Sequence, residues 1–219
     1  RALAETRKRL AQLGQAAAPL MLRGERGMRP ELFARLLAAT GAPFVEGPEM
    51  LAEASAEMLT RAAGGVLFVG DLSRLGRGEQ KSLEFLLARS DKHKARVVSF
   101  SPVDGRVLIE KQEFDAGLVA RLSELVLKLP ALRDFAEDVP DLAALILVQL
   151  VEARACPPRR LSVAALNALR HHGWPGNLAE LESVVKNLAL GALEEDIALE
   201  DVERVLVAHA GSSPPPAIA

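Results

Sequence analysis

Few side chains in this sequence are placed to bind or transform a ligand. Arg23, Arg26 and Arg29 gather just before a predicted helix start, where guanidinium groups and helix amides can together bind an anion. Such an anion would be, for example, a cyclic dinucleotide or a phosphorylated partner. The alternative is that the three are ordinary solvated loop arginines, and their spacing alone favours this simpler interpretation.

Other reactive residue types lack the neighbours that their chemistry needs. His171 and His172 close a predicted helix, where a cation complements the helix dipole, and no third ligand is spaced for zinc. Ser99 and Ser101 have no His/Asp arrangement that would make a nucleophile. The lone Cys156 has no partner for an intrachain disulfide. We therefore predict neither a metal site nor a hydrolase.

Charge and hydropathy limit the classes of partner. The chain carries 27 basic and 29 acidic residues, so its net charge of -2 gives no electrostatic reason to bind nucleic acid or an anionic membrane directly. Any DNA binding is expected in a separate domain. No apolar run has the length of a membrane span, and the charged N-terminal residues 1–9 read as a helix rather than a signal sequence. A cytoplasmic protein is expected.

Short apolar runs alternate with helical patterns through most of the chain, which is typical of a parallel sheet covered by helices. The predicted strands are residues 19–22, 43–45, 66–69, 95–100 and 124–128. The predicted crossover helices are residues 31–39, 49–61 and 79–89. From residue 138 onwards only helices are predicted, at residues 138–153, 163–171 and 200–210 and in one helix that starts near Asn177.

The change of pattern divides the chain. Residues 1–135 are the predicted α/β subdomain, and residues 136–210 are the predicted helical subdomain. Residues 211–219 are rich in Gly, Ser and Pro and poor in large apolar side chains, so they are expected to be a linker or a disordered tail.

Residues 174–182, W-P-G-N-L-A-E-L-E, combine a rigid turn with a capped helix. Pro175 and Gly176 form the predicted turn, Asn177 is the predicted N-cap, and Glu180 completes a pair that resembles a capping box. Apolar residues then recur at helical spacing, so one stripe of this helix is predicted to be buried. Trp174 is expected in the core of the helical subdomain.

This stretch resembles the W-P-G-N-x-R-E-L-E signature in the lid of the sigma-54-dependent transcription activators, a family of bacterial AAA+ ATPases. Further stretches of the sequence are similar to motifs of that family, in the same order: P-F-V at 43–45, G-G-V-L-F-V at 64–69, L-P-A-L-R-D at 129–134 and L-S-V-A-A-L at 161–166. The resemblance implies an AAA+ P-loop-type fold, in which helices flank a five-stranded parallel sheet and a C-terminal all-α lid follows.

The family's phosphate loop, G-E-x-G-T-G-K-E, corresponds by this resemblance to residues 24–31, G-E-R-G-M-R-P-E. Its predicted nucleotide-contact positions are Gly24, Arg26, Gly27, Arg29 and Pro30. Pro30 stands in place of the lysine and supplies neither an ammonium group nor an N–H. Because a residue before proline avoids helical angles, Arg29 is expected to oppose the curl of the loop.

The other positions that handle ATP in the family also differ. Gly70 and Asp71 stand at the positions of the Walker B Asp-Glu pair. If the alignment is shifted by one residue, Asp71 takes the position of the Asp that positions magnesium. Pro102 stands at sensor I and Ala179 at the sensor II arginine, whereas Arg121 keeps one arginine-finger position. We therefore predict a pseudo-ATPase that is not an enzyme and has no ATP, magnesium or metal cofactor. Asp71 is also the predicted partner of Arg121, either across a subunit boundary or within the same domain.

Two functions follow from the resemblance. The first is an inactive AAA+-like domain of a bacterial transcription regulator, which acts in self-association or in signal relay between a receiver domain and a helix-turn-helix domain. The alternative is a sensor that binds a nucleotide-like or other anionic ligand in the degenerate nucleotide cleft of the family. Between residues 45 and 64 the chain lacks the G-A-F-T-G-A loop with which the family touches sigma-54, so remodelling of sigma-54 polymerase is not predicted.

Overall fold

The computed structural model describes residues 2–14, 16–47, 51, 55–192 and 194–210. The chain divides into two compact units. The first comprises Arg1–Glu25 and Arg29–Pro130, and the second comprises Arg26–Met28 and Ala131–Ala219. The short segment Arg26–Met28 thus belongs to the second unit, although it closely follows the first strand. The subdomain boundaries at residues 135 and 210 stay predictions.

The first unit is built on a five-stranded sheet in the order β2-β3-β4-β1-β5, and every neighbouring pair is parallel. Its strands are β1 (Leu20–Arg23), β2 (Phe44–Glu46), β3 (Val66–Asp71), β4 (Arg96–Ser101) and β5 (Leu125–Lys128). The central strands β3 and β4 are buried over nearly their whole length, as expected for a parallel sheet with both faces covered. The predicted sheet is confirmed.

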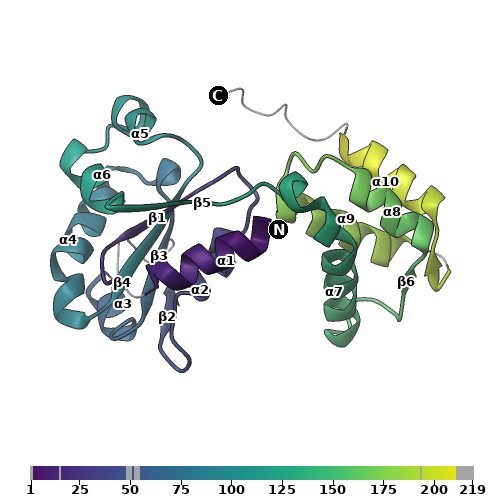
Figure 1. Ribbon diagram of the computed structural model, residues 1–219, viewed down its shortest axis with the longest axis horizontal. Helices are drawn as coiled ribbons and strands as arrows, with labels where there is room; N and C mark the ends of the chain where they lie inside the picture. Colours follow the sequence, from purple (N-terminus) through teal and green to yellow (C-terminus); the bar gives the residue numbers. More distant parts are fainter. Residues whose placement is uncertain (1, 15, 48–50, 52–54, 193, 211–219) are drawn as a thin grey trace. The chain divides into compact units, whose positions relative to one another are not determined.

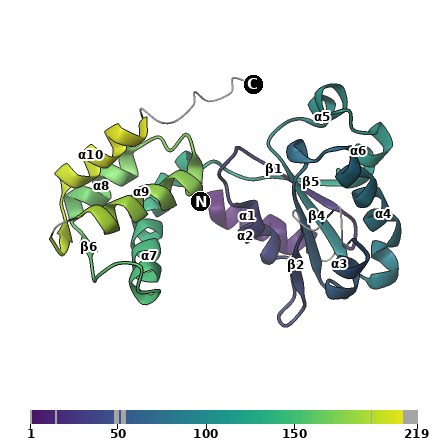
Figure 2. The same cartoon turned by 180° about the vertical axis from the view of Figure 1, so that it is seen from behind.

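Helices cover this sheet on both faces (Figures 1 and 2). One side carries α1 (Ala2–Leu13) and α2 (Pro30–Arg35), and the other carries α3 (Ser55–Arg61), α4 (Arg77–His93) and α6 (Ala116–Leu122). The 3-10 helix η1 (Leu72–Arg74) follows β3, and α5 (Gly105–Gln112) precedes α6. Part of the predicted helix 49–61 lies outside the described residues, and α3 accounts for its second half.

The sequence pattern did not predict α5 and α6, which are too short to show a clear apolar period. Both helices have an Asp N-cap. The side chain of Asp104 accepts from the backbone N–H of Arg106, and the side chain of Asp115 accepts from that of Leu118. These two caps are the local signal that could have revealed both helices.

Buried Arg96 ties α1 to the sheet. Its Nη1 donates to the carbonyl oxygen of Leu13 at 2.8 Å, and its Nε donates to that of Ala18 at 3.1 Å. Burial lowers the pKa of this guanidinium below its ordinary value. The two carbonyl partners offset part of the cost of burying the charge.

The second unit is mainly helical (Figure 1). Its elements are the 3-10 helix η2 (Leu132–Asp138), α7 (Val139–Glu152), β6 (Arg160–Leu161), α8 (Val163–His171), α9 (Asn177–Gly191), β7 (Asp196–Ile197) and α10 (Leu199–Ala210). The predicted N-cap Ser162 is confirmed, since its side chain accepts from the N–H of Ala165 at 3.1 Å. The short parallel pair of β6 and β7 was not predicted, because two residues are too few to show a strand pattern.

Trp174 anchors this unit. Its side chain is fully buried, its Nε1 donates to the carbonyl oxygen of Leu169 at 2.9 Å, and its ring meets that of His172 edge to face. The predicted core position of Trp174 is therefore confirmed. Among the residues that the structure describes, no helix is long and apolar enough to cross a membrane.

Candidate functional site

Several predicted site positions meet at the carboxyl edge of the sheet. In the register of the parallel strands, Arg23 at the end of β1 lies opposite Ser101 of β4, and Asp71 at the end of β3 lies opposite Phe100. Gly24 and Pro102 directly follow β1 and β4. This edge is where open α/β sheets bind their ligands.

The glycine-rich loop, residues 24–31, leaves β1 at this edge and forms a tight turn. Gly27 has φ 80° and Arg29 has φ 55°, and Pro30 follows as the first residue of α2. The prediction that Arg29 opposes the curl is wrong, because the residue takes the left-handed conformation and so helps to close the turn. Its guanidinium also forms an ion pair with Glu31.

Within the second unit, the start of α9 holds the middle of this loop. The N–H of Ala179 donates to the carbonyl oxygen of Gly27 at 2.9 Å. The side chain of Asn177 donates through Nδ2 to the carbonyl oxygen of Arg26 at 3.0 Å. Two positions predicted from separate motifs, Gly27 and Ala179, therefore lie side by side, and the backbone of Ala179 makes the contact.

Asn177 is not the N-cap that the sequence predicts. Gly176 takes that place, and its N–H donates to Glu180 Oε2 at 2.7 Å. Asn177 is instead the first residue of α9, with φ 54°, and its Oδ1 accepts from the N–H of Leu132 at 2.8 Å. This role was not predicted from the sequence, because an Asn that follows a Pro-Gly turn is most simply interpreted as a cap.

Asp71 is occupied by local contacts. Gly70 has φ 82°, beside a shift of register between β3 and β4, and Asp71 then begins η1 as its N-cap. The carboxylate accepts from the N–H and the Oγ of Ser73 at 2.9 and 2.7 Å and lies 3.6 Å from Arg74 Nε. Arg121 is exposed on α6, and among the described residues it forms no ion pair with Asp71 within the chain. A pair across a subunit boundary stays a prediction.

Arg23 and Arg29 both have acidic partners. Arg29 pairs with Glu31, and Arg23 Nη1 donates to Asp104 Oδ2 at 2.8 Å. The N–H of Arg106 and then the Arg23 guanidinium lower the pKa of Asp104 below its ordinary value. Any binding of an anion by Arg23 therefore competes with this carboxylate.

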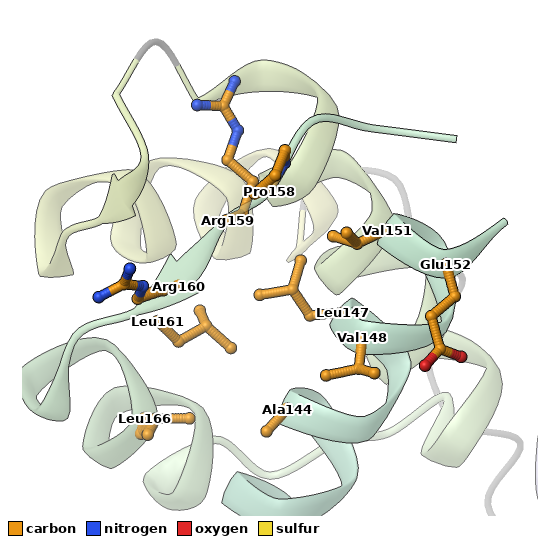
Figure 3. Close-up of a pocket in the computed structure, with 10 residues that line it drawn as sticks. All are labelled: Ala144, Leu147, Val148, Val151, Glu152, Pro158, Arg159, Arg160, Leu161 and Leu166. Atoms are coloured by element: carbon orange, nitrogen blue, oxygen red, sulfur yellow. The ribbon is translucent and has the colours of Figure 1, made fainter. Parts of the chain in front are cut away.

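The second unit contains a separate apolar pocket of about 350 Å³ (Figure 3). It is lined by Ala144, Leu147, Val148, Val151, Glu152, Pro158, Arg159, Arg160, Leu161 and Leu166. Arg159 donates to the carbonyl oxygen of Ala192, and Arg160 pairs with Glu195 at 3.0 Å. None of the site positions predicted from the sequence lines it. Within the described ranges, no group of three or more His, Cys, Asp or Glu side chains is arranged to hold a metal ion.

A parallel sheet with a glycine-rich loop after β1, followed by a helical lid, is the architecture of the AAA+ ATPases. The family model of the sigma-54 interaction domain matches residues 1–132, and that of the AAA+ ATPase lid domain matches residues 133–218. The chain belongs to the family of sigma-54 interaction domains, as the resemblance predicted.

Relatives support the same assignment. The DNA-binding transcriptional regulator NtrC of Bradyrhizobium sp. (strain RP501 Parasponia) is 31% identical, over 86% of this chain and 46% of NtrC. NtrC of Rhizobium meliloti (strain 1021) is 30% identical, over 97% of this chain and 51% of NtrC. The chain thus spans about half the length of these relatives. The crystal structure of NtrX from Brucella abortus matches the fold with a TM-score of 0.78 at 24% identity, over 100% of this chain and 56% of NtrX.

These findings correct two predictions. The sequence predicts a pseudo-ATPase that is not an enzyme, and it predicts no ATP or magnesium cofactor. Both predictions are wrong, because the homologues are AAA+ ATPases and NtrX has been crystallised in complex with ADP and with ATP. The physical reason is that backbone N–H groups do much of the phosphate binding in such loops, so the loss of the lysine at Pro30 does not decide nucleotide binding alone.

Proposed function

We propose that this chain is the nucleotide-binding AAA+ domain of a bacterial transcription regulator. In this proposal ADP or ATP binds at the glycine-rich loop, and the nucleotide state controls self-association and relays a signal between flanking receiver and helix-turn-helix domains. The observation that carries the proposal is the curled loop at the carboxyl edge of the sheet, with its middle segment held by the lid.

The geometry of the loop supports a phosphate ligand. Left-handed residues at Gly27 and Arg29 curl the backbone, as successive amides that converge on a phosphate require. The lid bonds to the carbonyl oxygens of Arg26 and Gly27, whereas a phosphate needs N–H donors. The two sets of interactions therefore do not compete for the same backbone atoms.

Positive charge at the loop must come from a side chain other than a P-loop lysine, since Pro30 has neither an ammonium group nor an N–H. Arg26 and Arg29 lie within the loop and are the residues that we assign to this role. Arg29 would exchange its partner Glu31 for a phosphate oxygen. NtrX, crystallised with ADP and with ATP, provides the precedent for an adenine nucleotide.

The wider role rests on the relatives. NtrC is a DNA-binding transcriptional regulator and is about twice the length of this chain. We therefore assign DNA contact to a separate domain. The proposal places the protein in the cytoplasm. Sigma-54 remodelling through a G-A-F-T-G-A loop is not part of the proposal, because residues 46–63 lack that sequence.

Thermal unfolding with and without ligand tests the proposal. ADP or ATP at about one hundred times its dissociation constant should stabilise the fold by about 2.7 kcal/mol, which is a shift of a few degrees. Gly27→Ala should reduce the shift by about half or more and Gly41→Ala should retain it, since both glycines have positive φ and only Gly27 lies in the loop. A shift with a cyclic dinucleotide but not with ADP would favour the sensor alternative, and no shift with any of these ligands would overturn the proposal.

A further inference from the structure

The side chain of Asn177 joins two points at which the chain passes between the units. The passages occur at residues 25/26, 28/29 and 130/131. Asn177 Nδ2 donates to the carbonyl oxygen of Arg26, just after the first passage, and Asn177 Oδ1 accepts from the N–H of Leu132, just after the last. The side chain is fully buried, and both ends of its amide are thus satisfied.

A backbone bond strengthens the same arrangement. The N–H of Ala179 lies in the first turn of α9, where N–H groups have no acceptor within the helix, and it donates to the carbonyl oxygen of Gly27. We call these three hydrogen bonds the loop clamp: Asn177 to Arg26, Asn177 to Leu132 and Ala179 to Gly27. The clamp lies wholly within the second unit.

We propose that Asn177 is a positioning residue that couples the glycine-rich loop to the lid, so that a nucleotide on the N–H side of the loop is sensed by α9 on its carbonyl side. The coupling rests on the proposed function, whereas the clamp itself does not. A phosphate that orders the amides of residues 25–29 also fixes the carbonyl oxygens between them, because each peptide plane is rigid. Through its two hydrogen bonds, Asn177 then fixes the positions of Leu132 and of the start of α9.

The chemistry of the position is specific to asparagine. The two bonds require a donor and an acceptor on one short side chain, and φ 54° requires a residue that tolerates the left-handed region. Aspartate has the same shape and tolerates the same backbone, but its ionised carboxylate only accepts. Asn177→Asp therefore keeps the bond to Leu132 and removes the bond to Arg26. Asn177→Gly suits the backbone as well and removes both bonds.

Residue-resolved amide hydrogen exchange tests the clamp without any ligand. In Asn177→Asp the Ala179 amide should exchange about fivefold faster, because the loop carbonyl is no longer held, while the Leu132 amide should exchange at its original rate. In Asn177→Gly both amides should exchange faster. Asn167→Asp, the same change at an exposed site of α8, should alter neither amide. Equal acceleration of both amides in Asn177→Asp would indicate a general loss of lid stability and would overturn the clamp. The absence of any acceleration would overturn it as well.

The emission of Trp174 tests the coupling, since it is the single tryptophan of the chain and lies buried in the lid. Saturating ADP should change its emission in the wild type and in Asn167→Asp, and at least threefold less in Asn177→Asp. Calorimetry on the same samples separates the two hypotheses. No binding of ADP to the wild type would reject the proposed function and the coupling with it. Binding without a change in Trp174 emission, or with an equal change in Asn177→Asp, would reject the coupling alone.

Discussion

Gly27 of the glycine-rich loop lies directly against Gly176 of the lid. A β-carbon added to Gly27 would lie 2.1 Å from the carbonyl oxygen of Gly176, which is closer than van der Waals contact allows. Gly27 also has φ 80°, which disfavours any other residue. The close approach explains why only glycine fits this position in the arrangement observed.

Gly27→Ala should therefore destabilise the second unit more than backbone strain alone would. Gly41 has nearly the same φ, 81°, and open space around its α-carbon, so Gly41→Ala isolates the cost of the left-handed backbone. We expect about 1 kcal/mol for Gly41→Ala and a further 1–3 kcal/mol for Gly27→Ala, since the clash is with backbone. Urea unfolding followed by circular dichroism measures both losses, and equal losses would show that the loop is not held against the lid.

Trp174→Ala should remove about 3–5 kcal/mol from the free energy of unfolding, because it empties a buried site and removes the indole hydrogen bond to the carbonyl oxygen of Leu169. Val163→Ala, at a position with 76% exposure on α8, is the control and should cost less than about 0.5 kcal/mol. Urea unfolding followed by circular dichroism gives both values. A loss below about 1 kcal/mol for Trp174→Ala would contradict the core position.

Asp104 should titrate below the ordinary aspartate range. The N–H of Arg106 and the Arg23 guanidinium both favour its ionised form, so its pKa is lower in the folded state than in the unfolded chain. The stabilisation is therefore present above the unfolded pKa and is lost as the pH falls through the folded pKa. Carboxyl carbon chemical shifts in an NMR titration measure this pKa.

Arg23→Ala provides the check on that assignment. It should move the pKa of Asp104 part of the way back to its ordinary value, because the bond from Arg106 remains. Arg74→Ala, which touches Asp71 instead, should leave the pKa of Asp104 unchanged. A pKa of Asp104 that does not respond to Arg23→Ala would show that the ion pair is absent in solution.

Self-association should depend on Arg121. The guanidinium is exposed on α6 at the position that resembles an arginine finger, and we expect it to contact a carboxylate or a phosphate of a second copy. Arg121→Ala should weaken association about fivefold, which corresponds to about 1 kcal/mol for an exposed charged contact. Light scattering over a range of concentrations measures this, with Lys92→Ala on α4 as the control. A mass that stays monomeric throughout, or that ignores Arg121→Ala, would contradict the prediction.

The sequence predicted the central strands well because they carry apolar runs. Residues 66–69 of β3 are apolar and buried throughout, and Val97, Val98 and Phe100 give β4 the same signal. Ser162 and Trp174 were predicted correctly for a similar reason, since a cap and a large apolar ring act through their immediate surroundings.

The contacts of the loop could not be predicted in the same way. Arg26 and Asn177 are 151 residues apart in the sequence, and the bond between them depends on the tertiary fold. The curl at Arg29 likewise arose from a left-handed backbone that local propensity disfavours. The prediction that no nucleotide binds was also too broad. It rested on substitutions at single positions such as Pro30, whereas backbone groups bind phosphate without regard to side-chain identity.

Isothermal titration calorimetry of the wild-type chain with ADP tests the central claim most directly. The proposal predicts saturable binding with a dissociation constant below about 1 mM, which is a binding free energy of at least about 4 kcal/mol. Gly27→Ala should weaken this binding at least tenfold, whereas Gly41→Ala should bind like the wild type. Saturable heat that depends on Gly27 would support a nucleotide site at the loop. No heat of binding at millimolar ADP would contradict it.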